Sequence, residues 1–191
     1  YWGNLRSIGE RVGIAGKTSG VIPFIRVMDS LTLAISQGSL RRGSAAVYLP
    51  VSHPEIEEFI ELRRPTGGDP NRKAPNLHHG VLVPDAFMRA VEANEEWALV
   101  SPVDSAPVRK VRARDLWIRL LTARIEVGEP YIVFSDQVNR AVPDHHHKHL
   151  LRVVQHQAIP EPLLHELNQL IILVEHPPGE PRPLRTRCLR I

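Results

Sequence analysis

Short apolar runs that alternate with helical patterns limit the folds open to this chain more than any other feature. Three such runs occupy residues 45–49, 80–83 and 131–134. The clearest helical pattern between them covers residues 113–127, where apolar side chains recur every three or four positions and Gly128 follows as a stop. Short strands that are apolar throughout are typical of a parallel sheet covered by helices. The pattern therefore predicts an α/β fold with largely parallel strand pairing.

The other expected elements are placed by their first and last residues. Residues 21–35 have helical spacing, with Pro23 in the first turn, where the missing N–H costs little. Ser52 and Asp85 each precede a helical pattern and are predicted to be N-caps. The remaining expectations are loops at residues 36–44 and 64–76 and short strands at residues 97–100 and 108–111.

Composition excludes several classes of protein. Lys and Arg number 24 against 21 Asp and Glu, and 5% of residues are aromatic, with acids and bases interleaved, so a nucleic-acid-binding surface is disfavoured. No apolar run reaches the roughly 18 residues of a membrane span. The single cysteine, Cys188, excludes an internal disulfide framework and a four-cysteine zinc site. One cysteine also fits a reducing compartment, so we expect a cytoplasmic location.

The glycines and arginines of residues 36–44 form the first candidate site. Glycines let the backbone approach a ligand closely, and Arg41 and Arg42 supply planar donors suited to phosphate or base edges. The segment matches neither the Walker A pattern nor the dinucleotide-binding glycine fingerprint. From the residues alone, nucleotide contact and an ordinary solvated loop both remain open.

Histidines and carboxylates give weaker candidates. His78 and His79 could bind a metal, but a half-buried, hydrogen-bonded imidazole is favoured because no cysteine or acidic cluster completes a site. The histidine tract of residues 145–149 is interpreted as a solvated loop, and no metal site is predicted. The other candidates are Glu57, Glu58 and Glu61, interpreted as a solvated helix face, and Ser135 and Asp136, which follow a strand where α/β folds place ligands.

Several motifs in colinear order resemble the large (α) subunit of aerobic ribonucleotide reductase. The resemblance spans roughly residues 5–150 and looks most like the class I, diphosphate-reducing bacterial branch. It includes Ser-Gln-Gly-Ser-Leu-Arg-Arg-Gly-Ser at residues 36–44 and Gly-Glu-Pro-Tyr-Ile-Val-Phe-Ser-Asp at residues 128–136. The other matching stretches are residues 18–24, 48–50, 52–59, 63–69, 76–81, 101–102 and 138–140.

The resemblance implies a fold and a domain division. The family has a ten-stranded α/β barrel made of two five-stranded halves, with a catalytic cysteine on a finger loop at its centre. Residues 1–150 would form an incomplete part of the first half. Residues 151–191 do not resemble the family, and we expect them to be a divergent, proline-rich tail.

The resemblance also implies site residues. The substrate/effector loop, which relays effector identity to the substrate base, would consist of Ser36, Gln37, Gly38, Ser39, Leu40, Arg41, Arg42 and Gly43. Gln37 and Arg41 fall where the family contacts that base. Arg6, with the segment to Thr18, resembles the neighbouring loop that touches the specificity effector.

The family's chemistry requires groups beyond this chain. It reduces ribonucleoside diphosphates under dNTP and ATP control, as an α homodimer with a small (β) subunit whose di-metal centre generates a radical, and it uses a dithiol reductant. The Asn-Leu-Cys-x-Glu motif of the radical cysteine is missing after Asn139 and Arg140, and Cys188 has no matching context. We therefore expect no catalytic residue, no bound cofactor and no activity in this chain alone. The alternatives are a nucleotide-binding remnant acting through Arg6, Gln37 and Arg41, or a decayed gene product.

Overall fold

The computed structural model describes residues 1–14, 16–37 and 41–141. The elements, in chain order, are β1 (Arg11–Val12), β2 (Gly16–Lys17), α1 (Val21–Ala34), β3 (Ser36–Gln37), β4 (Arg41–Arg42), β5 (Ala46–Pro50), α2 (Ile56–Ile60), η1 (Pro70–Arg72), β6 (His78–Val83), α3 (Asp85–Ala93), β7 (Glu96–Val100), β8 (Pro107–Arg112), α4 (Ala113–Val127), β9 (Tyr131–Phe134) and α5 (Ser135–Ala141).

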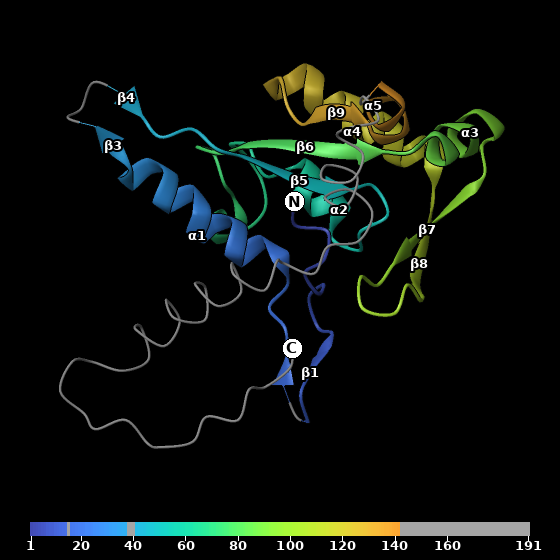
Figure 1. Cartoon of the computed structure of the whole chain (residues 1–191), viewed down its shortest axis with the longest axis horizontal. Helices are drawn as coiled ribbons and strands as arrows, with labels where there is room; N and C mark the ends of the chain where they lie inside the picture. Colours follow the sequence, from blue (N-terminus) through green and yellow to red (C-terminus); the bar gives the residue numbers. More distant parts are fainter. Residues whose placement is uncertain (15, 38–40, 142–191) are drawn as a thin grey trace. The chain divides into compact units, whose positions relative to one another are not determined.

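A parallel sheet of order β5-β6-β9 forms the centre of this region (Figure 1). Its register aligns Leu49 with Val81 and Val81 with Ile132. Parallel neighbours require crossover connections, and here α2 lies between β5 and β6, while α3, β7, β8 and α4 lie between β6 and β9. The predicted α/β fold with parallel pairing is confirmed. The strands expected at residues 97–100 and 108–111 form the antiparallel pair β7–β8.

Buried aromatic and aliphatic side chains join the helices to one face of the sheet. Phe59 of α2 and Phe87 of α3 are fully buried, as are Val81 of β6 and Leu120 of α4. Helix α4 has the bounds that its periodicity predicts, and Gly128 ends it in the left-handed conformation, with φ of 78°. The core therefore forms where short apolar strands alternate with helices that bury one face.

The opposite face of the sheet carries a row of aromatic residues around a glycine. The register aligns Tyr48 with Gly80 and Gly80 with Tyr131 across all three strands. A Cβ at Gly80 would lie 2.7 Å from the Tyr48 ring, so only glycine lets this ring lie over the central strand. His78, two residues before Gly80, stacks on Tyr131 with ring centroids 5.9 Å apart.

Two predicted N-caps are wrong. Helix α2 begins at Ile56, and its entry is shaped by His53, whose Nδ1 accepts a hydrogen bond from the Glu55 amide at 3.1 Å, so Ser52 caps nothing. Asp85 is the first residue of α3 rather than its cap, and its amide donates to Asp136 Oδ2 at 2.8 Å. In both cases the hydrogen bond is accepted by a side chain other than the predicted cap.

Two expected loops contain short regular structure. Residues 36–44 were predicted to be an irregular loop, but β3 and β4 pair antiparallel within them. The loop at residues 64–76 includes η1, whose preceding residue, Asp69, accepts a hydrogen bond from the Asn71 amide at 2.8 Å.

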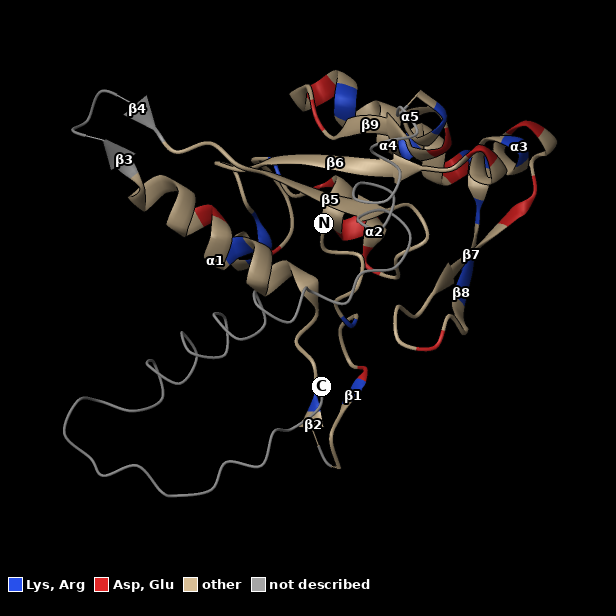
Figure 2. Ribbon diagram, in the orientation of Figure 1, with Lys and Arg blue, Asp and Glu red and all other residues tan. Residues whose placement is uncertain are grey.

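The described sheets do not close, as expected for an incomplete barrel: β5-β6-β9 has two edges, and the other sheets have two strands each. Basic and acidic residues are interleaved along the helices and the β7–β8 hairpin (Figure 2). None of the described helices is long and apolar enough to cross a bilayer. The histidine tract of residues 145–149, the expected tail of residues 151–191 and Cys188 lie outside the described residues.

Candidate functional site

The predicted substrate/effector loop lies at the carboxyl end of α1 as a hairpin of β3 and β4 (Figure 1). The register pairs Ser36 with Arg42 and Gln37 with Arg41. The two residues that the family resemblance implicates in base contact are therefore opposite each other, in the pair of the hairpin that lies farther from α1. Gly38, Ser39 and Leu40 lie outside the described residues.

Gly43 attaches the base of this hairpin to the last turn of α1. Its amide donates to the Ile35 carbonyl at 2.8 Å. A Cβ at this position would lie 2.6 Å from the Thr32 carbonyl oxygen and 2.8 Å from the Ile35 carbonyl oxygen, which no real side chain tolerates. A glycine is therefore required for the hairpin to fold back against the helix.

Asp29, in the middle of α1, fixes this helix to the chain just before β6. It is 5% exposed, and its Oδ1 accepts hydrogen bonds from the amides of Asn76 at 2.7 Å and Leu77 at 2.9 Å. Its Oδ2 accepts from Asn76 Nδ2 at 2.9 Å. The carboxylate thus holds α1, and the hairpin at its end, in a fixed position relative to the sheet.

The segment around Arg6 is held from both sides by the turn that precedes α2. His53 Nε2 lies 3.0 Å from the Leu5 carbonyl oxygen, and Glu55 Oε2 accepts a hydrogen bond from the Ile8 amide at 3.1 Å. The same Glu55 oxygen accepts from the amide of Val21, the first residue of α1, at 2.9 Å. A carboxylate at this position also complements the positive end of the helix dipole. Glu55 therefore joins the Arg6 segment to the start of α1.

Burial controls the protonation of this turn. It lowers the pKa of His53 below its ordinary value, against the opposing effects of the Leu5 carbonyl and the Glu10 charge, so the imidazole is neutral at pH 7. Burial raises the pKa of Glu55, while the Val21 and Ile8 amides and the Arg72 charge act in the opposite direction. Neutral His53 can then donate from Nε2 to Leu5 and accept at Nδ1 from the Glu55 amide.

Helix α1 connects the two predicted loops but keeps them apart. Its 14 residues span about 21 Å, with the Arg6 segment bound near its first residue and the hairpin attached to its last turn. Arg6 itself is half-buried. The structure therefore brings Gln37 and Arg41 together and leaves Arg6 at the opposite end of the same helix.

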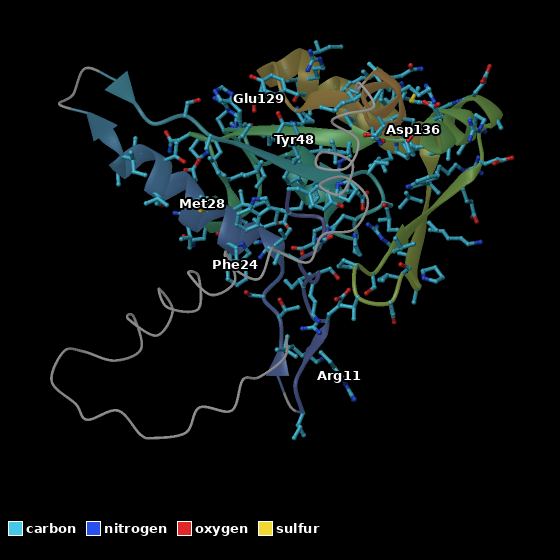
Figure 3. The ribbon with its side chains drawn as sticks, viewed as in Figure 1. Arg11, Phe24, Met28, Tyr48, Glu129 and Asp136 are labelled. Carbon is cyan, nitrogen blue, oxygen red and sulfur yellow. The ribbon has the colours of Figure 1, made fainter. Side chains whose placement is uncertain are left out.

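A second polar cluster surrounds Glu129 at the amino ends of β6 and β9 (Figure 3). Glu129 Oε1 lies 2.5 Å from both Arg63 NH1 and His78 Nδ1. Glu129 Oε2 accepts from the His79 amide at 3.0 Å and lies 2.8 Å from His79 Nδ1. This carboxylate joins the chain after α2 to two strands of the sheet.

His79 is more buried than the half-buried imidazole that the sequence predicts: it is 1% exposed, its Nδ1 lies 2.8 Å from Glu129 Oε2, and its Nε2 has no hydrogen-bond partner among the described residues. Burial lowers its pKa, against the opposing effect of Glu129. Burial alone would raise the pKa of Glu129, but hydrogen bonds from His78 and the His79 amide, with the positive charge of Arg63, outweigh it and lower this pKa. The cluster is therefore an ionised carboxylate beside a neutral buried histidine.

The glutamates predicted on a solvated face of α2 are 27% to 38% exposed, and arginines from other elements bind all three. Arg119 NH1 lies 2.9 Å from Glu57 Oε1, and Arg119 NH2 lies 2.6 Å from Glu61 Oε1. Glu58 Oε2 accepts from Arg72 NH2 at 2.7 Å. These ion pairs fix α2 to α4 and η1 and leave no carboxylate pair arranged for acid–base chemistry.

Ser135 and Asp136 follow β9 at the carboxyl edge of the sheet, as the sequence suggests. Asp136 Oδ2 accepts a hydrogen bond from the amide of Asp85, and Arg140 NH2 lies 2.9 Å from Asp85 Oδ2. Asp136 and Arg140 thus fix Asp85 at the start of α3. Among the described residues, no group of three His, Cys, Asp or Glu side chains is placed to hold a metal ion.

Sequence reasoning missed Asp29, Glu55 and Glu129, the three carboxylates that hold the candidate loops and strands in place. Asp29 and Glu129 lie inside otherwise ordinary helical and turn patterns. The available signal was the conflict between a charged residue and its apolar surroundings, as in Asp29 on the buried side of α1 beside Ile25.

Comparison with known proteins gives a consistent family. A family model described as the barrel domain of ribonucleotide reductase matches residues 1–151. A Frog virus 3 protein, provisionally named a ribonucleoside-diphosphate reductase large subunit, is 46% identical over 142 residues, covering 74% of this chain and 24% of the viral protein.

Two further relatives carry the same kind of name. The ribonucleoside-diphosphate reductase large subunit of Invertebrate iridescent virus 6 is 39% identical, and the α subunit of Chlamydia muridarum is 35% identical. They cover 78% and 75% of this chain, which spans 16% of each of them. Because these relatives are viral and bacterial, the bacterial class I branch stays a prediction.

The chain therefore spans a quarter or less of each of these three relatives. The motif resemblance, the parallel sheet with its open edges and the family match agree. This chain belongs to the ribonucleotide reductase barrel-domain family.

Proposed function

We propose that this chain is the part of a class I ribonucleoside-diphosphate reductase large subunit that transmits effector identity to the substrate site. Residues 1–150 would be the partial barrel domain, and residues 151–191 a separate tail. The observation that carries the proposal is the placement of the Arg6 segment and the Ser36–Arg42 hairpin at the two ends of α1.

The physical basis is a chain of contacts between the two loops. A nucleotide that moves the Arg6 segment acts on Ile8, whose amide shares the Glu55 carboxylate with Val21 at the start of α1. The other end of α1 is fixed to Gly43 at the base of the hairpin. An effector can shift the hairpin only through a difference in binding energy between two arrangements of these contacts.

Substrate, reductant and radical would come from outside this chain. The intact enzyme would reduce ribonucleoside diphosphates, take its radical from a di-metal centre in a small subunit and draw electrons from a dithiol, in the cytoplasm. Within the chain the hairpin would orient the substrate base, with Gln37 and Arg41 as its planar donors. Since the only cysteine is Cys188, the thiol chemistry would depend on residues elsewhere in the enzyme.

Binding of deoxynucleoside triphosphates to the 191-residue chain tests the proposal. We expect weak binding in calorimetric titration, and an Arg6→Ala variant that binds about tenfold more weakly, since one charge-assisted hydrogen bond is worth about 1.5 kcal/mol. Arg112→Ala, which removes an exposed arginine of β8, is the matched control and should bind as the unchanged chain does. Absence of heat above dilution for all four nucleotides would contradict the proposal.

An apolar stripe on α1 supports the α homodimer that belongs to this proposal. Phe24, Val27 and Leu31 recur at helical spacing and are 51%, 64% and 45% exposed. Phe24 lies on the side of α1 turned away from the three-stranded sheet (Figure 3). A second copy of this helix would cover the stripe.

The dimer is tested by substituting the stripe with charge. We expect the chain to self-associate in sedimentation velocity and Leu31→Glu to shift it to the monomer, because a buried, unpaired carboxylate opposes association. Ile125→Glu, on α4 at a residue that is 86% exposed, should leave association unchanged. A chain that is monomeric at every concentration would contradict the homodimer.

A further inference from the structure

A basic cavity lies between α1 and the segment that joins α2 to β6. It measures about 610 Å3, within the range of small-ligand sites, and includes Arg26, Ser30, Arg63, Arg64, Gly68 and Lys73 in its lining. None of these residues belongs to the loops assigned above to effector or substrate.

Two of its cations are already neutralised. Arg63 lies 2.5 Å from Glu129 Oε1, and Arg64 lies 2.5 Å from Glu126 Oε2. The one carboxylate in the lining, Asp29, uses both oxygens to accept hydrogen bonds from Asn76 and Leu77. The two arginines therefore add no net charge, while Asp29 keeps its negative charge, because its partners are neutral amides, and this charge opposes one of the remaining cations.

The other two cations have no carboxylate partner among the described residues. Arg26 NH1 donates to the Pro70 carbonyl at 2.5 Å, and Lys73 Nζ donates to the Glu61 carbonyl at 3.0 Å. Each hydrogen bond to a carbonyl holds the side chain in place without neutralising it. Two positioned positive charges thus line one cavity.

Gly67 and Gly68 leave room in the lining for a ligand close to the backbone. Gly67 and Gly68 have φ of 80° and 75°, a conformation that favours glycine. The Lys73 ammonium lies 3.8 Å from where a Gly68 Cβ would be, so the charge sits beside exposed backbone. The exposed Ser30 on α1 adds a hydroxyl to the lining.

We propose that this cavity binds a phosphate-bearing anion, with Arg26 and Lys73 as its main ligands. Guanidinium and ammonium groups are the usual protein partners of phosphate oxygens, and the cavity exceeds the size of a single phosphate, which favours a diphosphate or larger. Because Arg26 and Ser30 lie on α1, an anion bound here contacts the helix that carries the hairpin. The site is independent of the nucleotide contact proposed for Arg6.

Inorganic pyrophosphate is the probe, added to the complete 191-residue chain in calorimetric titrations at low and raised salt. We expect saturable binding that weakens with salt, and at least about a tenfold loss in the double variant Arg26→Gln/Lys73→Gln, since each charge-assisted hydrogen bond is worth about 1.5 kcal/mol or more. The control Lys110→Gln/Arg112→Gln removes the same charge from β8 and should retain the affinity. Arg6→Ala should also retain it, which separates this site from the proposed effector contact.

Ser30→Glu provides a second, less disruptive variant. It adds a carboxylate to the lining at an exposed helical position and breaks no hydrogen bond of Arg26 or Lys73, so the thermal unfolding midpoint should be kept while pyrophosphate binding is lost. Absence of binding to the unchanged chain, or an equal loss in the β8 control, would overturn the proposal. A nucleoside diphosphate, titrated in parallel, distinguishes the source of the anion: equal affinity supports free pyrophosphate, and tighter binding supports a nucleotide in the same cavity.

Discussion

Replacing Asp29 by alanine is expected to lower the free energy of unfolding by about 3 kcal/mol, because hydrogen bonds to a buried charged group are worth more than neutral ones. The carboxylate accepts three hydrogen bonds, and its loss leaves the buried Leu77 amide without a partner. Both α1 and the entry to β6 would lose their common anchor. Urea denaturation followed by circular dichroism measures the change.

Two variants control for the position and for the charge. Ser30→Ala, at an exposed neighbouring residue of α1, should change stability by less than about 0.5 kcal/mol. Asp29→Asn keeps one acceptor oxygen but replaces the other with an amide donor that faces the donors of Asn76 and Leu77. Its loss of unfolding free energy should therefore lie between the losses in Asp29→Ala and Ser30→Ala. Hydrogen exchange at the Asn76 and Leu77 amides should accelerate in Asp29→Ala. Unchanged stability in that variant would mean that water replaces the carboxylate and that α1 is not fixed by it.

Acidification is expected to destabilise the chain by up to about 2 kcal/mol between pH 7 and about 5.5, through His53 and His79. Burial lowers the pKa of both residues in the folded state below the ordinary value of 6.5. Below pH 6.5 the unfolded chain therefore binds protons that the folded chain does not. As the pH is lowered, the free energy of unfolding decreases by at most about 1.4 kcal/mol per pH unit for each histidine, until the pH passes the pKa of that histidine in the folded state.

The carboxylates act in different windows. The lowered pKa of Glu129 gives stability that is present above its ordinary value of 4.5 and lost as pH falls further, so it adds to acid destabilisation only below the histidine range. The raised pKa of Glu55 has the opposite sign, since its burial favours the protonated form and costs stability as pH rises past 4.5. The slope between pH 6.5 and 5.5 therefore belongs mainly to the histidines.

Urea denaturation at a series of pH values tests this slope. His79→Asn, which retains a donor toward Glu129, and His53→Gln, which retains one toward Leu5, should each remove about half of it. The double variant should show little dependence between pH 7 and 5.5. A double variant with the full slope would mean that other groups take up the protons.

The sequence predicted best those elements whose signals are local. The bounds of α4 follow from apolar spacing over residues 113–127 and from Gly128, so nothing distant is needed to define them. The three parallel strands were likewise found from apolar runs at residues 45–49, 80–83 and 131–134, to within one or two residues at each end. Helical spacing and strand length are properties of the segment itself.

The predictions that failed involve partners far along the chain. The amide of Val21, at the start of α1, is bound by Glu55, 34 residues away, and the amide of Asp85 by Asp136, 51 residues away. Asp29 binds amides 47 and 48 residues away. No periodicity reports such contacts, so Asp85 was assigned as a cap on local grounds. The same limit applies to α2, whose glutamates bind arginines from distant elements. The Ser52 cap failed for a local reason, because the adjacent His53 accepts the hydrogen bond from the Glu55 amide.

The two edges of the central sheet differ in what they offer a further strand. Outside β5, the Trp2 amide already donates to the Tyr48 carbonyl at 2.9 Å. Outside β9, no strand pairs with Tyr131–Phe134 in the described part of the chain, so a row of N–H and C=O groups is free to act as a template. A further strand can therefore be added to this sheet more readily beside β9 than beside β5. The four residues of β9 are both the place where a larger barrel would continue and the place where copies of this chain would aggregate.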